Sequence, residues 1–544
     1  MSSFLDCLIL GFYDYPFEDY VNMLRSIGPQ SGAYHDLSLA YIDYEGRPLR
    51  ALDVMTKFYC ERNPGTGRPF HNSDFLSPAV AYLTTYLDRR GFHVDFVNLP
   101  HLETEKLRRA LEQPVRAVAI TTTLYVSPHP ILALIAEIRR YNPDVKIIVG
   151  GPYISNQAHL LDHNDLRVLL QYLGADIYVL CREGEATLAS LISCLQKGVP
   201  LDLVPNLAFW GRNGSFNCTP RMEESNSLTE YVMDYRMFDK STVGQFLSIQ
   251  TAKSCPFACA YCGFPERAGE YRFLDVHNVE KQLDAIVGIG TVTTLSFLDD
   301  TFNVPKGRFK DIMRMMIRNN YSLKWNCFYR VDQGDDEAID LMAEAGCEGV
   351  FLGVESGSDQ MLTLMNKSAR RKHYIHAIPK LHAAGISTYA SLIIGFPGET
   401  SETVKETMTF LEETAPEYYR AQLWYADPLT PILKKRHEHG LSGEGFNWNH
   451  RTMNVFDACE WITKIFLTVR SSEWLPQFGF EQWSIFYLQR KGMSRRQIRS
   501  FLGCFNAIVR HRIVSGNCDP PSGLISALRA SCEFDNEQIY RHRA

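Results

Sequence analysis

The sequence lacks the features of a membrane, exported or nucleic-acid-binding protein. No apolar run among its 544 residues reaches the roughly 20 residues needed to span a membrane, and its opening stretch has no basic leader. The formal net charge is −6, so no excess of positive charge attracts nucleic acid or an anionic membrane. We therefore expect a cytoplasmic protein that has neither partner, and we expect it to be a monomer.

The sequence also lacks the cysteine pattern of a disulfide framework. Its 14 cysteines are scattered from Cys7 to Cys532, and in a long chain without an export signal they are expected to be reduced. The length predicts two or three domains, because single cores stop growing at about 250–300 residues. A content of 45% hydrophobic and 22% charged residues predicts that these domains are folded.

One tight cysteine group stands out in the segment "SCPFACAYCGFP", where Cys255, Cys259 and Cys262 are spaced Cys-x3-Cys-x2-Cys. Three thiolates at this spacing can ligate three irons of a [4Fe–4S] cluster and leave the fourth iron open. Zinc is the main alternative, but structural zinc sites normally close with a fourth Cys or His, and His277 stands alone fifteen residues further on. The alternative that these are three unrelated thiols has a prior probability of about one in twenty at this spacing.

The first 200 residues alternate extended and helical patterns. The ranges 4–11, 92–99, 115–125, 145–153 and 175–185 read as strands, and 77–90 and 129–142 as helices. This alternation predicts a parallel sheet that binds its ligand at the carboxyl ends of the strands. The residues at those ends, many of them small enough for a large flat ligand to approach the backbone, are Thr121, Thr122, Thr123, Tyr125, Ser127, Gly150, Gly151, Pro152, Tyr153, Glu183, Gly184 and Glu185.

The remaining chain divides into three segments. Residues 201–245 read as a linker that contains a hairpin with its turn at 212–214. From 246 to 420 the strand-then-helix rhythm predicts a partial barrel with polar groups at four strand ends. Residues 421–544 read as a mainly helical domain, in which 488–512 is a basic amphipathic helix. Its basic face is either simply solvated or a dock for an acidic carrier protein.

The two motif groups together resemble one enzyme family. The cysteine motif resembles that of the radical S-adenosylmethionine (SAM) enzymes, and the succession "AITTTLYVSP", "IVGGPYIS", "REGEATL" resembles their cobalamin-binding domain. The resemblance implies an α/β protein with three parts. These are a Rossmann-like cobalamin-binding domain (1–200), a radical SAM partial (β/α) TIM barrel (246–420) and the helical domain (421–544). The Asp-x-His-x-x-Gly signature is missing, so the resemblance implies cobalt without a protein imidazole.

The resemblance also assigns site residues. Cys255, Cys259 and Cys262 would hold the [4Fe–4S] cluster as metal ligands and act in catalysis. Tyr261 and the stretch Ile393 to Gly395 would contact the adenine of SAM. Asp299 or Asp300 would contact its amino group, although "LDD" replaces the usual Gly-Gly-Glu. Glu355 and Ser356 would contact its ribose or carboxylate. Arg330 is also among the residues that would contact SAM. The residues listed above at the carboxyl ends of the strands predicted within residues 1–200 would contact cobalamin.

The implied function is methyl transfer by a cobalamin-dependent radical SAM enzyme, with methylcobalamin as the methyl donor. The acceptor would be an unactivated carbon or a phosphinate phosphorus of a natural-product intermediate, because "FLDCLILGFYDYPFEDYVNML" resembles the phosphinothricin-pathway P-methyltransferase group. The substrate would be a small molecule, free or bound to a carrier protein, and the electron donor a flavodoxin or ferredoxin. Two alternatives stay open: oxidative cyclisation or ring rearrangement without methylation, and a cobalamin or Fe–S sensor.

Overall fold

The computed structural model describes residues 4–28, 30–65, 70–211, 213–224 and 226–533. The chain forms two compact units. The first unit consists of residues 1–16 and 75–242, and the second of residues 17–74 and 243–544. Each unit is built on its own seven-stranded sheet.

The sheet of the first unit has the predicted parallel core. Its first strand is buried along its whole length, as expected for a parallel strand covered on both faces. At one edge β8 pairs antiparallel with β7, and β9 pairs antiparallel with β8, so β9 again runs in the direction of the core strands. The order is β4 (Val94–Val97), β1 (Leu5–Leu10), β5 (Val115–Thr121), β6 (Lys146–Gly150), β7 (Ile177–Val179), β8 (Leu207–Trp210) and β9 (Phe216–Cys218).

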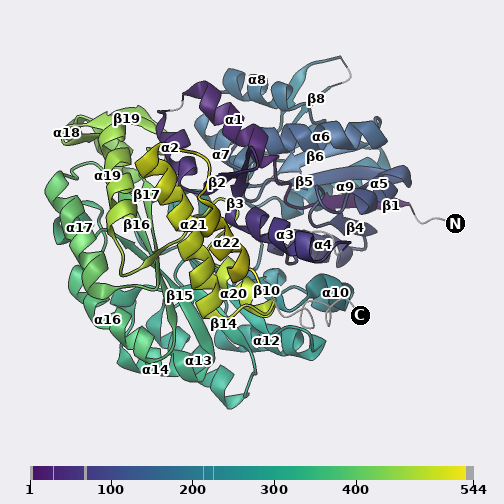
Figure 1. Cartoon of the computed structure of the whole chain (residues 1–544). Coiled ribbons are helices and arrows are strands. Elements are labelled where there is room, and N and C mark those ends of the chain that lie inside the picture. The colour runs from purple at the N-terminus through teal and green to yellow at the C-terminus, as the bar shows by residue number, and fades with distance from the viewer. Residues whose placement is uncertain (1–3, 29, 66–69, 212, 225, 534–544) are drawn as a thin grey trace. The chain divides into compact units, whose positions relative to one another are not determined.

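Helices cover both faces of this sheet (Figure 1). On one face, apolar side chains of α5 (Thr104–Glu112), α6 (His129–Tyr141), α7 (Pro152–Leu160) and α8 (His163–Leu173) join the strands in one core cluster. On the other face, α4 (Pro78–Asp88) and α9 (Glu185–Lys197) pack against β1 and against each other. The five predicted strands and two predicted helices are therefore confirmed, and the first unit is a doubly wound α/β fold.

Two of the predicted domain boundaries differ from the structure. The hairpin predicted in the linker is formed by β8 and β9, and it extends the sheet by pairing with β7. Residue 212 in its turn lies outside the described residues. The first unit therefore runs to residue 242 rather than to 200. The second difference is that residues 17–74 belong to the second unit, because Asp36 pairs with the buried Arg420 and α2 (Gly32–Ser38) packs against α19 (Val455–Thr468).

The second unit contains a parallel sheet whose strands follow one another in chain order. The strands are β10 (Phe246–Ile249), β13 (Thr294–Phe297), β14 (Lys324–Phe328), β15 (Cys347–Glu355), β16 (Ser387–Ile394), β17 (Tyr418–Leu423) and β21 (Glu473–Trp474). Among these described strands β10 and β21 are not paired with each other, so the barrel is open, as predicted. The connecting helices, which lie outside the strands in Figure 1, are α12 (Val276–Ile289), α13 (Lys306–Arg318), α14 (Asp336–Glu344), α16 (Arg371–Ala383) and α17 (Ser401–Thr414).

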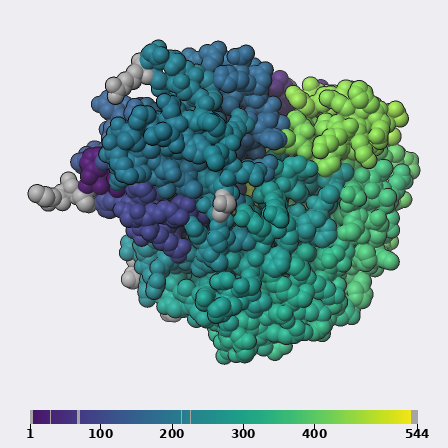
Figure 2. Space-filling model, turned by 180° about the vertical axis from the view of Figure 1, so that it is seen from behind, coloured from purple at the N-terminus to yellow at the C-terminus, as the bar shows by residue number. Residues whose placement is uncertain are grey.

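The residues after 420 do not form a domain of their own. Strand β17 crosses the predicted boundary, and β21 extends the barrel sheet by pairing with β17. The predicted basic helix is formed by α20 (Ser484–Arg490) and α21 (Arg495–Ser515). The apolar side of α21 is buried, and Arg495 donates to the carbonyls of Gly385 and Glu348. In Figure 2 the teal and green barrel residues form the lower face of this unit, with the lime segment that follows β17 at its edge.

No helix in the described ranges combines the length and the apolar character required to cross a membrane. The longest described helix among those after residue 420, α21, carries five arginines over its 21 residues.

Candidate active site

The three predicted cluster ligands line one cavity of about 300 Å³ in the second unit. The cavity lies at the carboxyl ends and inner faces of the barrel strands, where barrel enzymes build their sites. Its wall also contains the predicted residues Tyr261, Asp300, Arg330 and Glu355. The other lining residues are Phe257, Phe264, Thr301, Phe328, Tyr329, Phe351, Leu352, Gly353, Lys367, Tyr389, Ser391, Gln422, Gln477 and Gln482.

The cysteine loop is held in place through its backbone. The amide of Ala260 donates to the carbonyl of Met365 at 2.8 Å, and the amide of Ile432 donates to the carbonyl of Ala260 at 3.0 Å. The side-chain amide of Asn366 donates to the carbonyl of Ala258 at 2.6 Å. Two segments distant in sequence therefore fix the loop between its first and last cysteine, so that all three thiols face one cavity.

Burial favours the protonated form of two of the three thiols. It raises the pKa of the Cys255 thiol, and it raises the pKa of Cys262 to about 11. Because iron ligands must be thiolates, loading the site releases protons. Three thiols on one open cavity, with no fourth cysteine or histidine lining it among the described residues, fit a [4Fe–4S] cluster with one accessible iron and do not fit a closed zinc site.

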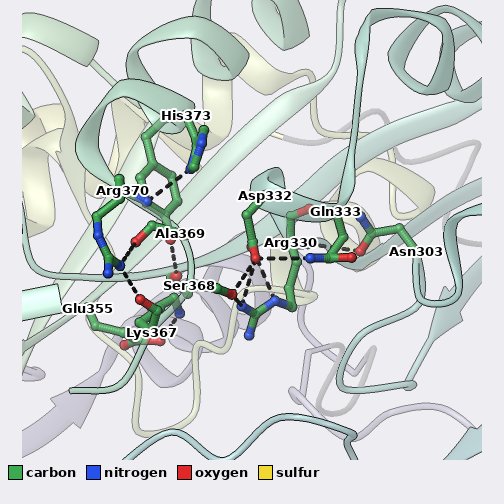
Figure 3. A network of polar contacts seen from close by, with 12 residues as sticks. Asn303, Arg330, Asp332, Gln333, Glu355, Lys367, Ser368, Ala369, Arg370 and His373 are labelled. Atoms are coloured by element: carbon green, nitrogen blue, oxygen red, sulfur yellow. Dashed lines mark hydrogen bonds and ion pairs between the residues drawn. The ribbon is translucent and has the colours of Figure 1, made fainter. Parts of the chain in front are cut away.

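A buried ion pair lies beside the cysteine loop. The Lys367 ammonium donates to Glu355 Oε1 at 3.0 Å and to the Tyr261 hydroxyl at 3.2 Å, and that hydroxyl donates to the same carboxylate oxygen at 2.9 Å. Lys367 is 5% exposed and Glu355 8%. Figure 3 shows the pair from close by. Lys367, for which the sequence leaves open both a place in the site and a solvated helix end, is therefore part of the cavity wall.

Gly353 makes room for this pair. A Cβ atom at Gly353 would lie 2.5 Å from Glu355 Oε1, which is closer than real Cβ atoms approach other atoms. It would also lie 3.2 Å from Lys367 Nζ, which is closer than most real Cβ contacts. Glu355 itself ends β15 with a φ of +66°, a backbone conformation that is uncommon outside glycine. Such strain persists only where surrounding contacts fix the residue, as they do here, and it is typical of functional sites.

Arg330 forms a second fixed cation on the cavity wall. Its guanidinium is bonded to both carboxylate oxygens of Asp332, at 3.2 and 3.0 Å, and to the Ser368 hydroxyl at 2.7 Å (Figure 3). It also lies over the ring of Phe257, inside the cysteine loop, at 3.6 Å from the ring centroid. Arg330 is thus placed next to the cysteine loop in one orientation, with its charge balanced by Asp332.

The two neighbouring aspartates have separate roles. Asp300 lines the cavity, and burial together with the nearby Asp299 raises its pKa to about 7. Asp299 does not line it. Its carboxylate is 1% exposed and accepts hydrogen bonds from the amides of Thr251 and Ala252 and from the Thr251 hydroxyl. Of the two alternatives predicted for the amino group of SAM, the geometry retains Asp300 and gives Asp299 a structural role.

Three further predicted SAM contacts are absent from the cavity wall. The Ser356 hydroxyl is buried and accepts from the amide of Ser358, with the Thr407 hydroxyl 3.2 Å away. Neither Ile393 nor Gly395 is among the lining residues. A Cβ on Gly395 would lie 2.4 Å from the Trp448 ring, so this glycine allows the chain after β17 to pack closely on β16. The predicted strand ends are present, but these three residues do not line the cavity.

Glu399 supports the turn below Gly395. Its side chain is fully buried, one carboxylate oxygen accepts from the Gly395 amide, and the other has no partner among the described atoms. Burial raises the pKa of Glu399 from 4.5 to about 8. The folded protein therefore binds one more proton than the unfolded chain between pH 4.5 and 8.

We expect this proton to make stability pH-dependent. As the pH rises from 4.5 to 8, the unfolded chain ionises first, so the free energy of unfolding falls by about 1 kcal/mol per pH unit. Glu399→Gln removes this contribution, so its melting temperature relative to wild type should increase with pH across that window. Glu402→Gln, an exposed carboxylate on the same turn, is the control and should give a constant difference. A pH-independent effect of Glu399→Gln would contradict a protonated Glu399.

The first unit contains a cavity of about 150 Å³ at the carboxyl ends of β5, β6 and β7. Seven of the predicted cobalamin-contacting residues line it: Thr121, Thr123, Gly150, Gly151, Pro152, Gly184 and Glu185. The other lining residues are Ala79, Tyr82, Leu83, Ala119, Ile120, Ile148, Val179, Arg182 and Leu188. Those from α4, which lies between β1 and β4 in the chain, were missed because residues of a helix that covers a sheet carry no loop signal in the sequence.

The remaining five predicted residues of this unit do not line the cavity. They are Thr122, Tyr125, Ser127, Tyr153 and Glu183. Thr122 is fully buried and its hydroxyl joins two loops by donating to the Gly150 carbonyl and accepting from the Tyr153 amide. The loop instead exposes two apolar side chains, Leu124 at 60% and Val126 at 87%. Thr122 and Tyr125, which were predicted to face the ligand, are therefore buried in the protein instead.

The two glycines after β6 are required by the protein itself. A Cβ on Gly151 would lie 3.0 Å from the amide and hydroxyl of Thr122, at a φ of +101° that favours glycine, and one on Gly150 would lie 3.1 Å from Val179 Cβ. They bring the loops together so that the backbone itself forms the cavity wall. Next to them, burial and the nearby Glu224 raise the pKa of Glu185 to about 7.

Comparison with known proteins assigns both units. Residues 249–411 match the family model of the radical SAM superfamily, and residues 72–192 match that of the B12 binding domain. The chain therefore carries a radical SAM domain and a B12-binding domain, the combination predicted for a cobalamin-dependent radical SAM enzyme.

Relatives support this at modest identity. An uncharacterized methyltransferase of Pyrococcus horikoshii, PH0819, is 25% identical over 336 residues, which cover 61% of this chain and 70% of that protein. An anaerobic magnesium-protoporphyrin IX monomethyl ester cyclase of Rubrivivax gelatinosus is 23% identical over 381 residues, 65% of either chain. The matched part thus spans about two thirds of these relatives.

Solved structures share the fold. The radical SAM methyltransferase TsrM of Kitasatospora setae, with cobalamin and a [4Fe–4S] cluster bound, has a TM-score of 0.59 at 17% identity, covering 86% of this chain and 96% of that one. The cobalamin-dependent radical enzyme OxsB with aqua-cobalamin has a TM-score of 0.53 at 15% identity, covering 89% and 77%. The predicted α/β fold class and the predicted cofactor set are confirmed at the level of the two domains.

Proposed function

We propose that this protein is a radical SAM methyltransferase that uses cobalamin to methylate an unactivated carbon or a phosphinate phosphorus of a small molecule. The observation that carries the proposal is the convergence of Cys255, Cys259 and Cys262 with a buried ion pair on one cavity, in a chain that also has a B12-binding domain. When bound, the cluster supplies the electron that cleaves SAM, and cobalamin carries the methyl group.

The protein's own groups bind and orient these cofactors. The three cysteines would ligate the cluster. Lys367 and Arg330 are fixed cations beside it and suit the carboxylate of SAM, whereas Asp300 suits its amino group. Tyr261 and Glu355 hold Lys367 in place and offer a carboxylate and a hydroxyl to the ribose. In the first unit, the glycine-walled cavity and the exposed Leu124 and Val126 are suited to the nucleotide tail and the flat ring of cobalamin.

One alternative is favoured by a specific relative. Because the Rubrivivax gelatinosus protein is a cyclase, a ring-forming reaction without methylation is the second candidate function. We further propose a cytoplasmic monomer that receives electrons from a flavodoxin or ferredoxin and acts on a free or carrier-bound substrate.

The test follows the methyl group and the adenosyl group of SAM separately. We expect anaerobically reconstituted protein, reduced with dithionite and given methyl-deuterated SAM, to form 5′-deoxyadenosine and S-adenosylhomocysteine, with the label recovered in the cobalamin fraction. During turnover each methylated product should be accompanied by about one molecule of each. Formation of 5′-deoxyadenosine with no S-adenosylhomocysteine and no label in cobalamin would move the assignment to the cyclase alternative.

A further inference from the structure

The cavity that holds the three cysteines has a second region whose polar groups are all uncharged. It is formed by two strands and the segment after β21, and we refer to it as the amide end: Tyr389 and Ser391 of β16, Gln422 of β17, and Gln477 and Gln482. The aromatic rings of Phe328 and Phe351 line the cavity next to it, with their centroids 5.3 Å apart.

The strand register places Tyr389 of the amide end deeper in the barrel than Glu355. Tyr389 pairs with Phe351, whereas Glu355 at the carboxyl end of β15 pairs with Leu392, three residues further along β16. At about 3.3 Å per residue, this separates Tyr389 from the level of Glu355 by roughly 10 Å, and Ser391, which pairs with Gly353, lies between the two levels. Gln477 belongs to the deeper level because its amide donates to the Tyr389 hydroxyl at 3.0 Å. The charged groups Asp300, Arg330, Glu355 and Lys367 come from strand ends and loops at the mouth.

Two polar groups of the amide end are open to a ligand. In the part of the chain that the structure describes, neither the Ser391 hydroxyl nor the Gln482 side-chain amide has a hydrogen-bond partner, although Gln482 is only 9% exposed. Buried polar groups are almost always paired, since an unpaired one costs about 1–3 kcal/mol. A hydroxyl and a primary amide together offer both donors and acceptors to a bound molecule.

The amide end offers no cation to an anion. The nearest arginine on these strands, Arg420, is fully buried, pairs with Asp36 at 2.7 Å and lies over the Trp474 ring, and it is not part of the cavity wall. Arg330 and Lys367 at the mouth already have carboxylate partners, Asp332 and Glu355. A carboxylate or phosphinate at the amide end would therefore be buried without a counter-charge, which is strongly unfavourable.

We propose that the amide end binds the methyl acceptor through an uncharged, flat group that both donates and accepts hydrogen bonds, such as a carboxamide, lactam or hydroxylated ring. The aromatic walls would stack on this group, and Ser391 and Gln482 would pair with its polar edge. This rests on the proposed function, and it favours a carbon centre of a neutral substrate over a phosphinate anion. SAM, which is held at the mouth, and this group would occupy the cavity together.

The test uses three probes with the same phenyl ring: benzamide, benzoate and phenylphosphinate. Dissociation constants are measured by ligand-observed NMR on the anaerobically reconstituted full-length protein, with and without SAM. We expect benzamide to bind at least tenfold more tightly than either anion, and its affinity to be unaffected by SAM. Gln482→Met and Ser391→Ala should each weaken benzamide about three- to tenfold, the loss of one neutral hydrogen bond. Gln360→Met, an exposed glutamine of the same unit, is the control.

Three results would overturn the proposal. Equal or tighter binding of benzoate or phenylphosphinate would show that the subsite takes anions. Competition between benzamide and SAM would assign the amide end to SAM. Absence of benzamide binding to the wild-type protein would remove the subsite, whatever the variants do. None of these measurements depends on catalysis, so failure of the proposed function, seen as absent SAM cleavage, is distinguishable from failure of this inference.

Discussion

Replacement of Cys255, Cys259 or Cys262 by alanine should reduce reductive cleavage of SAM to background. The three thiols line one cavity and no fourth cysteine or histidine of the described chain lines it, so each of them supplies a third of the protein ligands available to the cluster. Reconstituted wild-type protein should bind about four irons per chain, and each variant should bind far fewer. The measurements are iron content and 5′-deoxyadenosine by chromatography after reduction.

The control for this experiment is another cysteine of the same unit. Cys504 on α21 is partly exposed and does not line the cavity, so Cys504→Ala should keep both the iron and the activity. Because the cysteine loop is braced through backbone atoms of Ala260 and Ala258, the alanine variants should also keep the wild-type melting temperature of the iron-free protein. A variant that lacks all three cysteines yet still produces 5′-deoxyadenosine would disprove the assignment.

The features that the sequence predicted well are local ones. The Cys-x3-Cys-x2-Cys spacing needs only one loop to bring its thiols together, and strands such as β1 and β5 are short apolar runs whose burial on both faces is evident from composition. Because parallel strands end at one edge of a sheet, their order also indicated where both cavities lie.

What the sequence could not predict depends on contacts between distant residues. Asp299 and Asp300 are adjacent and chemically identical, and only the fold decides that Thr251 binds the first while the second faces the cavity. Lys367 resembles any lysine at a helix end until Glu355, twelve residues earlier, is seen 3.0 Å away.

Long-range packing also explains the misplaced boundaries. Residues 17–74 end close to a turn-rich stretch, "NPGTGRP" at 63–69, but nothing in it shows that the preceding residues join the second unit, where Asp36 neutralises Arg420, nearly four hundred residues further along. Gly395 has the sequence context of a ligand-binding turn, but Trp448 from a later hairpin covers it. Partners that lie so far apart in the chain leave no periodic signal in either segment.

The buried pair of Lys367 and Glu355 should be energetically coupled. Burial disfavours the charged lysine, but Glu355 and, to a smaller extent, Tyr374 and Cys259 together outweigh this effect and raise the pKa of Lys367. Lys367→Met leaves Glu355 buried with Tyr261 as its remaining partner, and such an unpaired charge costs about 3–5 kcal/mol. We expect the melting temperature to fall by about 5–10 °C, and we expect SAM binding to weaken at least tenfold because a cation beside the cysteine loop is lost.

A double-mutant cycle separates the coupling from the loss of either side chain. Glu355→Gln alone leaves the ammonium without its carboxylate, whereas the double variant Lys367→Met with Glu355→Gln removes both charges. The double variant should therefore be more stable than Lys367→Met alone, although it should not recover SAM binding. Lys372→Met, an exposed lysine on α16, is the matched control and should change neither quantity. Additive losses of stability in the double variant would show that the two charges do not interact, and Lys367 would then be an ordinary packing residue of the cavity wall.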